Sequence, residues 1–289
     1  MERLAAGFFI QIHSFCIMGN HFHILATGME LEAQKATTEE LLNRYKRMFG
    51  KEAEPPQGSY QSNGEIIPDA DGGMQRLRDR LGSVSRFVQE LKQSFSRWYN
   101  KKHDRKGYLW EGRFKGVIVY QGEAQLICSS YIELNPVRAG LARLPEDYKW
   151  SSLGIRMRLP GRAGKLLCPL TLADVLKGSQ ELPALSQIKV TADLLSVDWY
   201  RQFVYLAGGI EREGKAHVPK HVIDEVACLN GHLGIRGRLG YRVKNFSEGI
   251  AIGSYSAIAN IQESEKRKNI RPRLFLNTYW AYTTRVLRL

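Results

Sequence analysis

The chain has 289 residues, of which 43% are hydrophobic, so it is long and apolar enough to bury a core in one domain of ordinary size plus a smaller unit. Its 42 lysines and arginines outnumber its 29 aspartates and glutamates, and the formal net charge of +13 favours a polyanionic partner such as nucleic acid. The sequence has no apolar run of membrane-spanning length and no signal-peptide pattern, which predicts a cytoplasmic protein without a membrane partner. Its four cysteines are scattered without paired spacing, which predicts reduced thiols.

A β-hairpin is predicted near the start of the chain. Residues 8–17 are rich in aromatic and β-branched side chains, and Gly19-Asn20 then separates them from a second short strand, residues 21–25. On that strand His21 and His23 stand two apart, so both side chains leave the same face of the sheet. Such a pair is either half of a metal site or two histidines on a solvated strand face.

Two helices with an insertion between them are predicted next. Thr37 and Glu40 form a capping box before a short helix that Gly50 ends. Residues 51–73 are polar and rich in glycine and proline, which predicts a mobile insertion. Over residues 74–100 apolar side chains recur at steps of three and four, the pattern of one long amphipathic helix. Its basic polar face is either solvated or in contact with nucleic acid.

A strand over residues 117–120 and a helix over residues 122–139, interrupted late by Pro136, follow this helix. Just before the strand, Tyr108 and Trp110 have two interpretations. Their rings either pack in the core or stack on extruded bases, and we expect core packing.

The last part of the chain has weaker patterns. Helices are expected around residues 171–176, 197–207 and 221–230. After Glu265 no acidic residue remains while lysines and arginines continue, so this tail is either an arm that contacts phosphates or a solvated terminus.

The predicted helix over residues 122–139 carries a possible complement to the histidine pair. Tyr131 and Asn135 stand four apart and therefore share one helical face. Mg²⁺ and Mn²⁺ accept imidazole and oxygen ligands, so two histidines and one amide oxygen would leave positions open for phosphate oxygens and water. Taken alone, each residue also has a structural interpretation, Tyr131 as a packed aromatic and Asn135 as a helix cap before Pro136.

Four motifs occur in an order that resembles a known family. They are Gly-Asn-His-Phe-His-Ile-Leu from residue 19, Leu-Trp-Glu-Gly-Arg-Phe-Lys from residue 109, Tyr-Ile-Glu-Leu-Asn-Pro-Val-Arg-Ala-Gly-Leu from residue 131, and Tyr-Lys-Trp-Ser-Ser from residue 148. Together they resemble the REP-associated tyrosine transposases, which belong to the HUH single-tyrosine transposase superfamily. U in that name stands for a hydrophobic residue between two histidines.

The resemblance implies an α+β fold, a ferredoxin-like sandwich with an antiparallel sheet. This catalytic domain would span residues 1–155, and a mainly helical, basic accessory region would span residues 156–289. The implied function is a DNA transposase of a mobile element, which cuts and rejoins single-stranded DNA beside hairpins. The protein would act as a monomer or a homodimer.

The resemblance also assigns roles to individual residues. His21 and His23 match the HUH pair, Asn135 matches the third ligand of a divalent metal, Mg²⁺ or Mn²⁺, and Tyr131 matches the nucleophile. A tyrosine hydroxyl titrates near pH 10, so it needs help to attack phosphorus, and a bound cation can supply it. The implied product is a 5′-phosphotyrosine with a free 3′-OH, a transesterification that needs no nucleotide cofactor.

Three cations near these motifs are candidate DNA contacts. Arg113 and Lys115 precede the strand over residues 117–120, and Arg138 lies one turn past Asn135. Each is suited to hold a DNA phosphate, while Arg138 has the alternative role of a cation at a helix C-terminus.

The sequence departs from the family at its start, because members usually begin with a further strand before the first helix. In a ferredoxin-like sheet of order 4-1-3-2, that strand lies next to the strand with the histidines, and its absence would leave unpaired backbone groups. Three explanations are a mis-called start codon, a truncated element copy, or another segment in the gap. We favour a mis-called start or a truncation.

Two other functions remain open from the sequence. A truncated or domesticated copy would be a non-catalytic protein that binds DNA or RNA hairpins through its basic faces. A small HUH relaxase or replication initiator would use similar histidines, although those proteins usually carry a different tyrosine arrangement.

Overall fold

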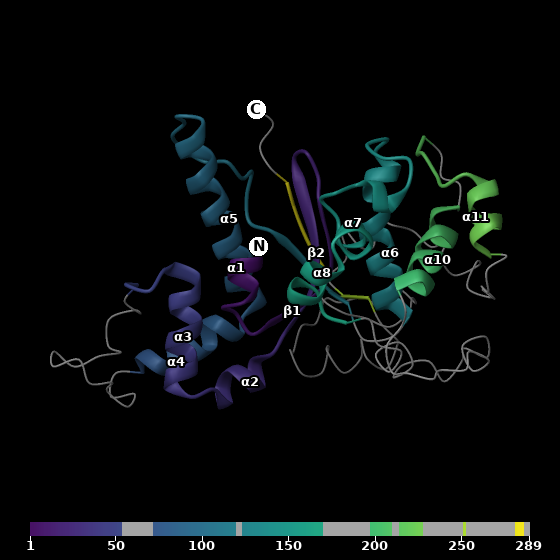
Figure 1. The fold of residues 1–289 in the computed structure, drawn as a ribbon. Coiled ribbons are helices and arrows are strands. Elements are labelled where there is room, and N and C mark those ends of the chain that lie inside the picture. Colours follow the sequence, from purple (N-terminus) through teal and green to yellow (C-terminus); the bar gives the residue numbers. More distant parts are fainter. Residues whose placement is uncertain are drawn as a thin grey trace, which may run out of the picture. The chain divides into compact units, whose positions relative to one another are not determined.

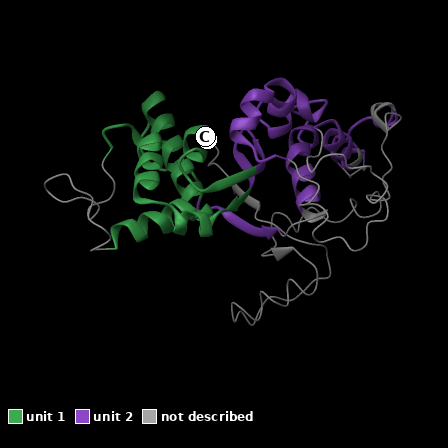
Figure 2. Cartoon of the chain, turned by 60° about the horizontal axis from the view of Figure 1, so that its bottom comes forward, with its two compact units in different colours: residues 1–12, 26–111 green, residues 13–25, 112–289 purple. Residues whose placement is uncertain are grey.

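The computed structural model describes residues 1–53, 72–119, 123–169, 197–209, 214–227, 251–252 and 281–285. These residues form a mixed α/β protein with two compact units, shown in two colours in Figure 2. The first unit comprises residues 1–12 and 26–111, and the second comprises residues 13–25 and 112–289. Most of the predicted insertion, the helix expected at 171–176 and most of the basic tail lie outside the described residues, and the domain boundary at residue 155 stays a prediction.

Helices make up most of the first unit. They are α1 (Glu2–Ala5), α2 (Glu30–Lys35), α3 (Thr38–Phe49), α4 (Gly73–Gly82) and α5 (Val84–Lys102), labelled in Figure 1. The Thr37 half of the predicted capping box is confirmed, because the Thr37 hydroxyl accepts a hydrogen bond from the Glu40 N–H at 3.2 Å. Gly50 ends this helix with φ at +112°, a conformation that favours glycine.

The single long helix predicted over residues 74–100 is wrong, because the chain forms two helices that break at Ser83. Ser83 is extended, with φ −87° and ψ 117°, and its hydroxyl caps α5 by accepting from the Arg86 N–H at 3.4 Å. Gly82 packs closely on α2, where an added Cβ would lie 3.1 Å from the Ala33 Cβ. The apolar spacing continues across the break, so periodicity alone did not reveal it.

The predicted hairpin is confirmed as β1 (Ile10–Ile17) and β2 (His21–Gly28). Its turn closes with a hydrogen bond of 2.8 Å from the Met18 N–H to the His21 carbonyl. The central residues of both strands are buried, as expected from their aromatic and aliphatic side chains.

The hairpin belongs to a sheet of order β1-β2-β5-β3-β4. The additional strands are β3 (Lys115–Val119), β4 (Ala251–Ile252) and β5 (Ala281–Arg285). β5 is antiparallel to both β2 and β3, and β4 is parallel to β3. A C-terminal segment therefore lies beside the histidine strand, where the sequence analysis expected an empty position. The favoured explanations, a mis-called start or a truncation, are not tested by this arrangement.

The remaining elements of the second unit are helical. They are α6 (Glu123–Arg138), η1 (Pro145–Asp147), α7 (Ser152–Arg158), α8 (Pro160–Leu166), α10 (Val197–Gly208) and α11 (Lys220–Ala227). The helices predicted near 197–207 and 221–230 correspond to α10 and α11.

Helix α6 is apolar on two sides, which is typical of a helix buried between layers. On one side Cys128 and Ile132 join a core that includes Leu25 of β2 and Val117 of β3. On the other side Leu126, Leu134 and Val137 pack with the buried side chains of α10, which Figure 1 shows beside α6. The side chains of α6 are therefore held from both directions.

The cysteine prediction is confirmed for two residues of this core. Cys16 and Cys128 are fully buried and carry free thiols, and burial raises the pKa of each well above its usual range. Neither is therefore a thiolate at neutral pH.

None of the helices in the described part of the chain has both the length and the apolar character of a membrane span.

Candidate functional site

The two predicted metal-ligand histidines lie together on β2. Their ring centroids are 4.9 Å apart and the rings are nearly perpendicular, at 89°. His23 is buried, with 4% of its surface exposed, whereas His21 is half-buried. The period-two pattern of a strand explains why both rings leave the same face of the sheet.

Different contacts act on the two histidine rings. Burial, with a smaller contribution from His21, lowers the pKa of His23 to about 3, so its imidazole is uncharged at neutral pH. The Nδ1 atom of His21 lies 2.7 Å from the side-chain oxygen of Asn20. An amide oxygen can only accept, so this contact assigns the His21 proton to Nδ1 and the lone pair to Nε2.

The proposed nucleophile is brought against this pair by α6. The ring centroid of Tyr131 lies 5.7 Å from that of His23, with an angle of 75° between the rings. The half-buried Tyr131 ring also packs on the core that contains Leu25 and Ile132. Two motifs that are far apart in the sequence therefore meet in the second unit.

Asn135 is oriented by its own helix. Its side-chain nitrogen donates to the Tyr131 carbonyl at 2.8 Å and lies 3.4 Å from the Ile132 carbonyl. Pro136 has no N–H to satisfy Ile132, so the Asn135 amide replaces part of that missing hydrogen bond. The nitrogen end of the amide is therefore fixed on the helix, and the oxygen end is the one directed away from these carbonyls.

The structure corrects the alternative in which Asn135 caps the helix before Pro136. Helix α6 continues through Pro136 to Arg138, and the Asn135 carbonyl accepts from the Ala139 N–H at 2.9 Å. A proline within a helix is tolerated here because a neighbouring side chain partly satisfies the carbonyl that it leaves.

The three predicted DNA contacts have different positions. Arg138 places its guanidinium carbon 5.8 Å from the centroid of the Tyr131 ring, so its charge faces the phenol. Lys115 is exposed at the start of β3 and, like His23, is paired in register with Thr283 of β5. Paired residues share a face, so Lys115 and His23 lie on the same side of the sheet, about 10 Å apart across two strand spacings. Arg113 is exposed in the segment before β3.

A buried polar network beside Tyr131 was not predicted. Glu133 is fully buried on α6, with the Ser152 hydroxyl donating to one carboxyl oxygen at 2.5 Å and the Leu153 N–H donating to the other at 3.0 Å. The Tyr200 hydroxyl lies 3.4 Å from the same carboxyl group. Burial raises the pKa of Glu133 to about 7, although these hydrogen bonds and the charge of Arg156 oppose the shift.

The Tyr-Lys-Trp-Ser-Ser motif connects this network to the sheet. The Ser152 hydroxyl accepts from the Phe15 N–H of β1 at 2.8 Å, and the Tyr148 hydroxyl donates to the Ile17 carbonyl at 2.8 Å. The Ile17 N–H donates to the Trp150 carbonyl at 2.9 Å. The motif therefore covers the outer edge of β1 and fixes α6 relative to the hairpin that carries the histidines. In the sequence, only the adjacent serines, which are typical of a helix N-cap, indicated this role.

The chemistry of the donor set decides what could be bound here. Among the described residues, no three His, Cys, Asp or Glu side chains gather into a metal-binding cluster, and the third ligand that the resemblance implies is the amide of Asn135. Two neutral imidazoles and one amide oxygen suit a divalent cation that also binds phosphate and water.

No protein-family model, curated protein or solved structure matches this chain.

Proposed function

We propose that this protein is a metal-dependent single-tyrosine transposase, which cleaves and rejoins single-stranded DNA next to hairpins. The observation that carries the proposal is the contact between Tyr131 and His23, whose ring centroids are 5.7 Å apart. A phenol in contact with one of two paired strand histidines, with an amide one turn and an arginine two turns further along its helix, is the arrangement that this chemistry needs.

The order of the sheet supports the same proposal. A ferredoxin-like sheet has four antiparallel strands in the order 4-1-3-2, and here β3, β5, β2 and β1 follow one another with β5 antiparallel to both of its neighbours. We infer that β5 takes the place of the first strand of a ferredoxin-like sandwich, with α6 on one face of the sheet.

His21, His23 and Asn135 are the residues that would hold the divalent cation, and the donor set of two neutral imidazoles and an amide oxygen fits Mg²⁺ or Mn²⁺. When bound, such a cation neutralises charge on the scissile phosphate and stabilises the leaving oxygen. The chain itself contributes the orientation of these ligands, because β2 fixes the two histidines and the Asn-Pro step fixes the amide.

The Tyr131 hydroxyl is the attacking group in this proposal. Its oxygen forms a bond to phosphorus while the bond between phosphorus and the 3′ oxygen breaks, and the leaving oxygen takes up a proton. The products are a 5′-phosphotyrosine and a free 3′-OH. The phosphotyrosine retains a phosphoester bond, which the reverse reaction can use to rejoin the strand. Arg138 beside the ring, and Lys115 on the same sheet face as His23, are placed to hold the phosphates of the strand.

A labelled-strand assay tests the proposal. The full chain is incubated with Mn²⁺ and a pool of hairpin DNAs whose single-stranded flanks are randomised, labelled at the 3′ end. A 5′-phosphotyrosine retains the 3′ fragment, so this label should move with the protein on a denaturing gel, and a 5′-end label should not. Tyr131→Phe should abolish the adduct, whereas Tyr45→Phe, a half-buried tyrosine of α3, should not.

The same assay separates the proposal from a non-catalytic hairpin-binding protein. An adduct that persists in Tyr131→Phe would exclude this nucleophile. Hairpin binding without any adduct, unaffected by a chelator or by His21→Ala, would instead favour the binding protein.

A further inference from the structure

The first unit carries a cluster of exposed and half-buried aromatic rings, three on the C-terminal half of α5 and one in the segment after it. We call it the aromatic face, and it consists of Phe95, Trp98, Tyr99 and Trp110. The sequence pattern predicted that Phe95 and Trp98 continue the buried stripe of a long helix, yet they are 40% and 52% exposed. Large exposed apolar side chains that gather in one place mark an interaction surface more often than scattered ones do.

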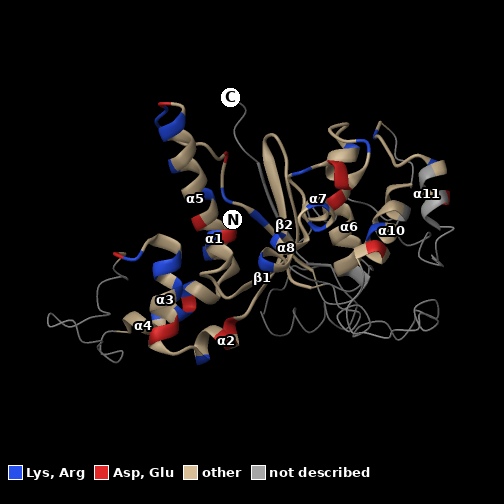
Figure 3. Ribbon diagram, in the orientation of Figure 1, with Lys and Arg blue, Asp and Glu red and all other residues tan. Residues whose placement is uncertain are grey.

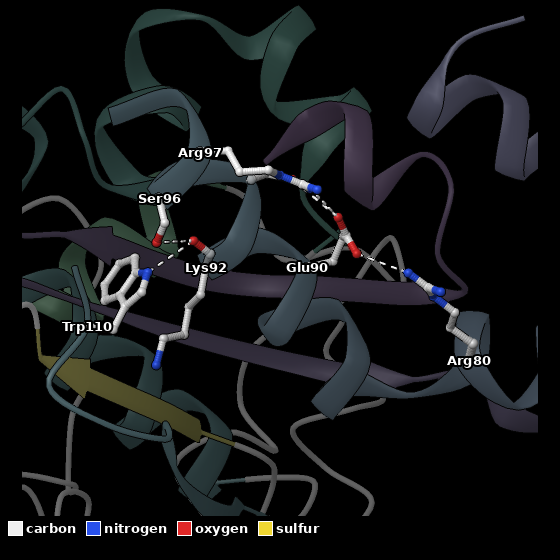
Figure 4. A network of polar contacts seen from close by, with 7 residues as sticks. Arg80, Glu90, Lys92, Ser96, Arg97 and Trp110 are labelled. Carbon is white, nitrogen blue, oxygen red and sulfur yellow. Dashed lines mark hydrogen bonds and ion pairs between the residues drawn. The ribbon is translucent and has the colours of Figure 1, made fainter. Parts of the chain in front are cut away.

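The rings of this face support one another. The Phe95 centroid lies 5.6 Å from that of Trp98, 5.9 Å from that of Tyr99 and 5.8 Å from that of Trp110. Trp110 is further fixed because its indole N–H donates to the Lys92 carbonyl at 3.0 Å, as Figure 4 shows. The face is therefore held in place before any partner binds, which lowers the entropy cost of binding.

Positive charge surrounds the aromatic face. Residues 92–106 contain six lysines and arginines and one acidic residue, Asp104. The ammonium of Lys102 lies 5.0 Å from the Trp98 ring, and that of Lys92 lies 5.1 Å from the Trp110 ring. Figure 3 shows this basic character at the C-terminal end of α5. Lys101, Lys102, Arg105 and Lys106 are all exposed.

The only acidic residue of α5 does not counter these charges. Glu90 is buried, with 5% of its surface exposed, and its two carboxyl oxygens contact Arg80 at 3.0 Å and Arg97 at 2.9 Å (Figure 4). Helix α5 therefore presents aromatic rings and cations without an exposed carboxylate, so a negatively charged partner meets no repulsion from this helix.

We propose that the aromatic face binds single-stranded DNA, with bases stacked on Trp98 and Phe95 and phosphates in contact with the exposed cations of residues 101–106. Unpaired bases stack on aromatic side chains, and the strand's phosphates require cations beside them. Tyr108, two residues before Trp110, was expected to pack in the core, and that prediction is wrong because Tyr108 is 91% exposed.

The choice of DNA over RNA rests on the proposed function, while the surface itself lies in the unit that does not contain Tyr131. The binding experiment therefore uses the full chain with Tyr131→Phe and a chelator, so that no cleavage contributes to the signal. The probe is a fluorescein-labelled oligo(dT) of about 16 nucleotides, followed by fluorescence anisotropy.

Trp98→Ala should weaken oligo(dT) binding about tenfold, because one stacked base contributes that much by alanine substitution. Trp98→Phe should keep most of the affinity. The matched control is Trp150→Ala, since Trp150 is 53% exposed and has Lys149 at 5.1 Å from its ring but joins no aromatic cluster among the described residues. Equal thermal midpoints for the three variants would show that each is folded.

The phosphate contacts are tested by salt. The double variant Lys101→Ala with Lys102→Ala should reduce the slope of log affinity against log salt by about 1.4, since each phosphate contact contributes about 0.7 for a single strand. Unchanged oligo(dT) affinity in Trp98→Ala, or an equal loss in Trp150→Ala, would overturn the proposal. Tighter binding of oligo(U) would overturn the assignment to DNA, and conversion of a dimer to a monomer by Trp98→Ala at unchanged affinity would make the face a protein interface.

The two proposals fail separately. A chain that forms no tyrosine adduct can still lose oligo(dT) binding in Trp98→Ala, which would leave the DNA surface established and the transposase chemistry refuted. If the adduct forms and Trp98→Ala leaves oligo(dT) binding unchanged, the transposase chemistry is supported and the DNA surface on α5 is refuted.

Discussion

The two units each bury one glutamate of a helix, and they stabilise it in different ways. In the first unit Glu90 contacts Arg80 and Arg97, whose side chains are 36% and 68% exposed. In the second unit Glu133 accepts from a serine hydroxyl and a backbone N–H and lies near a tyrosine hydroxyl, and its pKa is raised to about 7 by burial. The first carboxylate is thus compensated by charge at the surface, and the second mainly by neutral donors in the core, with a smaller contribution from Arg156.

The way in which each glutamate is compensated matches the role of the helix that carries it. The ion pairs of Glu90 neutralise the only acid of α5 and leave the exposed cations beyond it without competition. The network of Glu133 connects α6 to β1 through Ser152, and α6 is the helix that holds Tyr131 against His23. A charged surface tolerates rearrangement, whereas a buried network of neutral donors fixes a position.

The largest effect is expected from removing the buried carboxyl of the second unit. Glu133→Ala leaves the Leu153 N–H without its acceptor, leaves the Ser152 hydroxyl only the Phe15 carbonyl at 3.2 Å, and opens a cavity, so we expect a loss of about 4 kcal/mol in the free energy of unfolding. Glu90→Ala releases two arginines that already reach solvent, so about 1 kcal/mol is expected. Urea unfolding of both variants measures the difference.

Hydrogen exchange assigns each loss to a unit. Faster exchange should be confined to α6 and α7 in Glu133→Ala, and to α4 and α5 in Glu90→Ala. Equal losses in the two variants would mean that the distinction between surface and core compensation is wrong.

The raised pKa of Glu133 predicts that the stability of the protein depends on pH. Its folded value of about 7 lies above the ordinary value of 4.5, so between these values the folded state binds more protons than the unfolded state. Stability should therefore fall as pH rises from about 4.5 to about 7 and then level off, by about 3 kcal/mol in total at 1.36 kcal/mol per pKa unit. Arg156 and Tyr200, which face the same carboxyl group, belong to this titration.

Chemical denaturation at pH 5 and pH 8 measures this effect. Glu133→Gln cannot ionise, so its stability should change less between the two pH values than that of the parent chain. A parent whose second unit gains stability as pH rises would contradict the assignment of a buried, partly protonated carboxyl.

A third contrast concerns where each unit draws its elements in the sequence. The first unit is built mostly from the continuous stretch 26–111. In the second unit, by contrast, β5 comes from residues 281–285 and pairs with β2 and β3, which lie much earlier in the sequence. Thr283→Pro removes a backbone N–H from the middle of this sheet and should cost about 2 kcal/mol, while Thr283→Val should cost little. Hydrogen exchange at β2 should rise only in the proline variant, and the adduct with hairpin DNA should decrease with it.

The sequence was sufficient for local elements and for which residues share a face. The capping residues Thr37 and Gly50, the hairpin around Gly19-Asn20 and the common face of His21 and His23 all follow from short-range patterns, and the structure confirms them. The function and the metal stay predictions, because no described contact tests them.

Long-range pairings could not be predicted. Nothing in residues 281–285 indicates that they pair with β2, because strand register depends on partners that a single sequence does not reveal. Glu133 likewise gave no signal of burial, since its donors at Ser152 and Tyr200 come from other parts of the chain. The break at Ser83 was missed because the apolar spacing continues across it, although Ser83 caps α5 and Gly82 packs closely on α2.

The smallest effects are expected at two serine caps, one in each unit. They test whether the burial of a cap, and not only its hydrogen bond, determines how much stability is lost when the serine is replaced by alanine. Ser83 caps α5 by accepting from the Arg86 N–H at 3.4 Å, and Ser83 is partly exposed. In Ser83→Ala a water molecule can therefore take the place of the hydroxyl, and the expected loss of stability is about 0.5 kcal/mol. Ser151 caps α7 at 3.1 Å from the Gly154 N–H and is fully buried, so Ser151→Ala leaves that donor without water and should cost about 2 kcal/mol. Thermal unfolding of the two variants compares them directly. Equal costs would show that the second unit hydrates its caps as readily as the first, and the network that holds α6 would then be less rigid than its hydrogen bonds suggest.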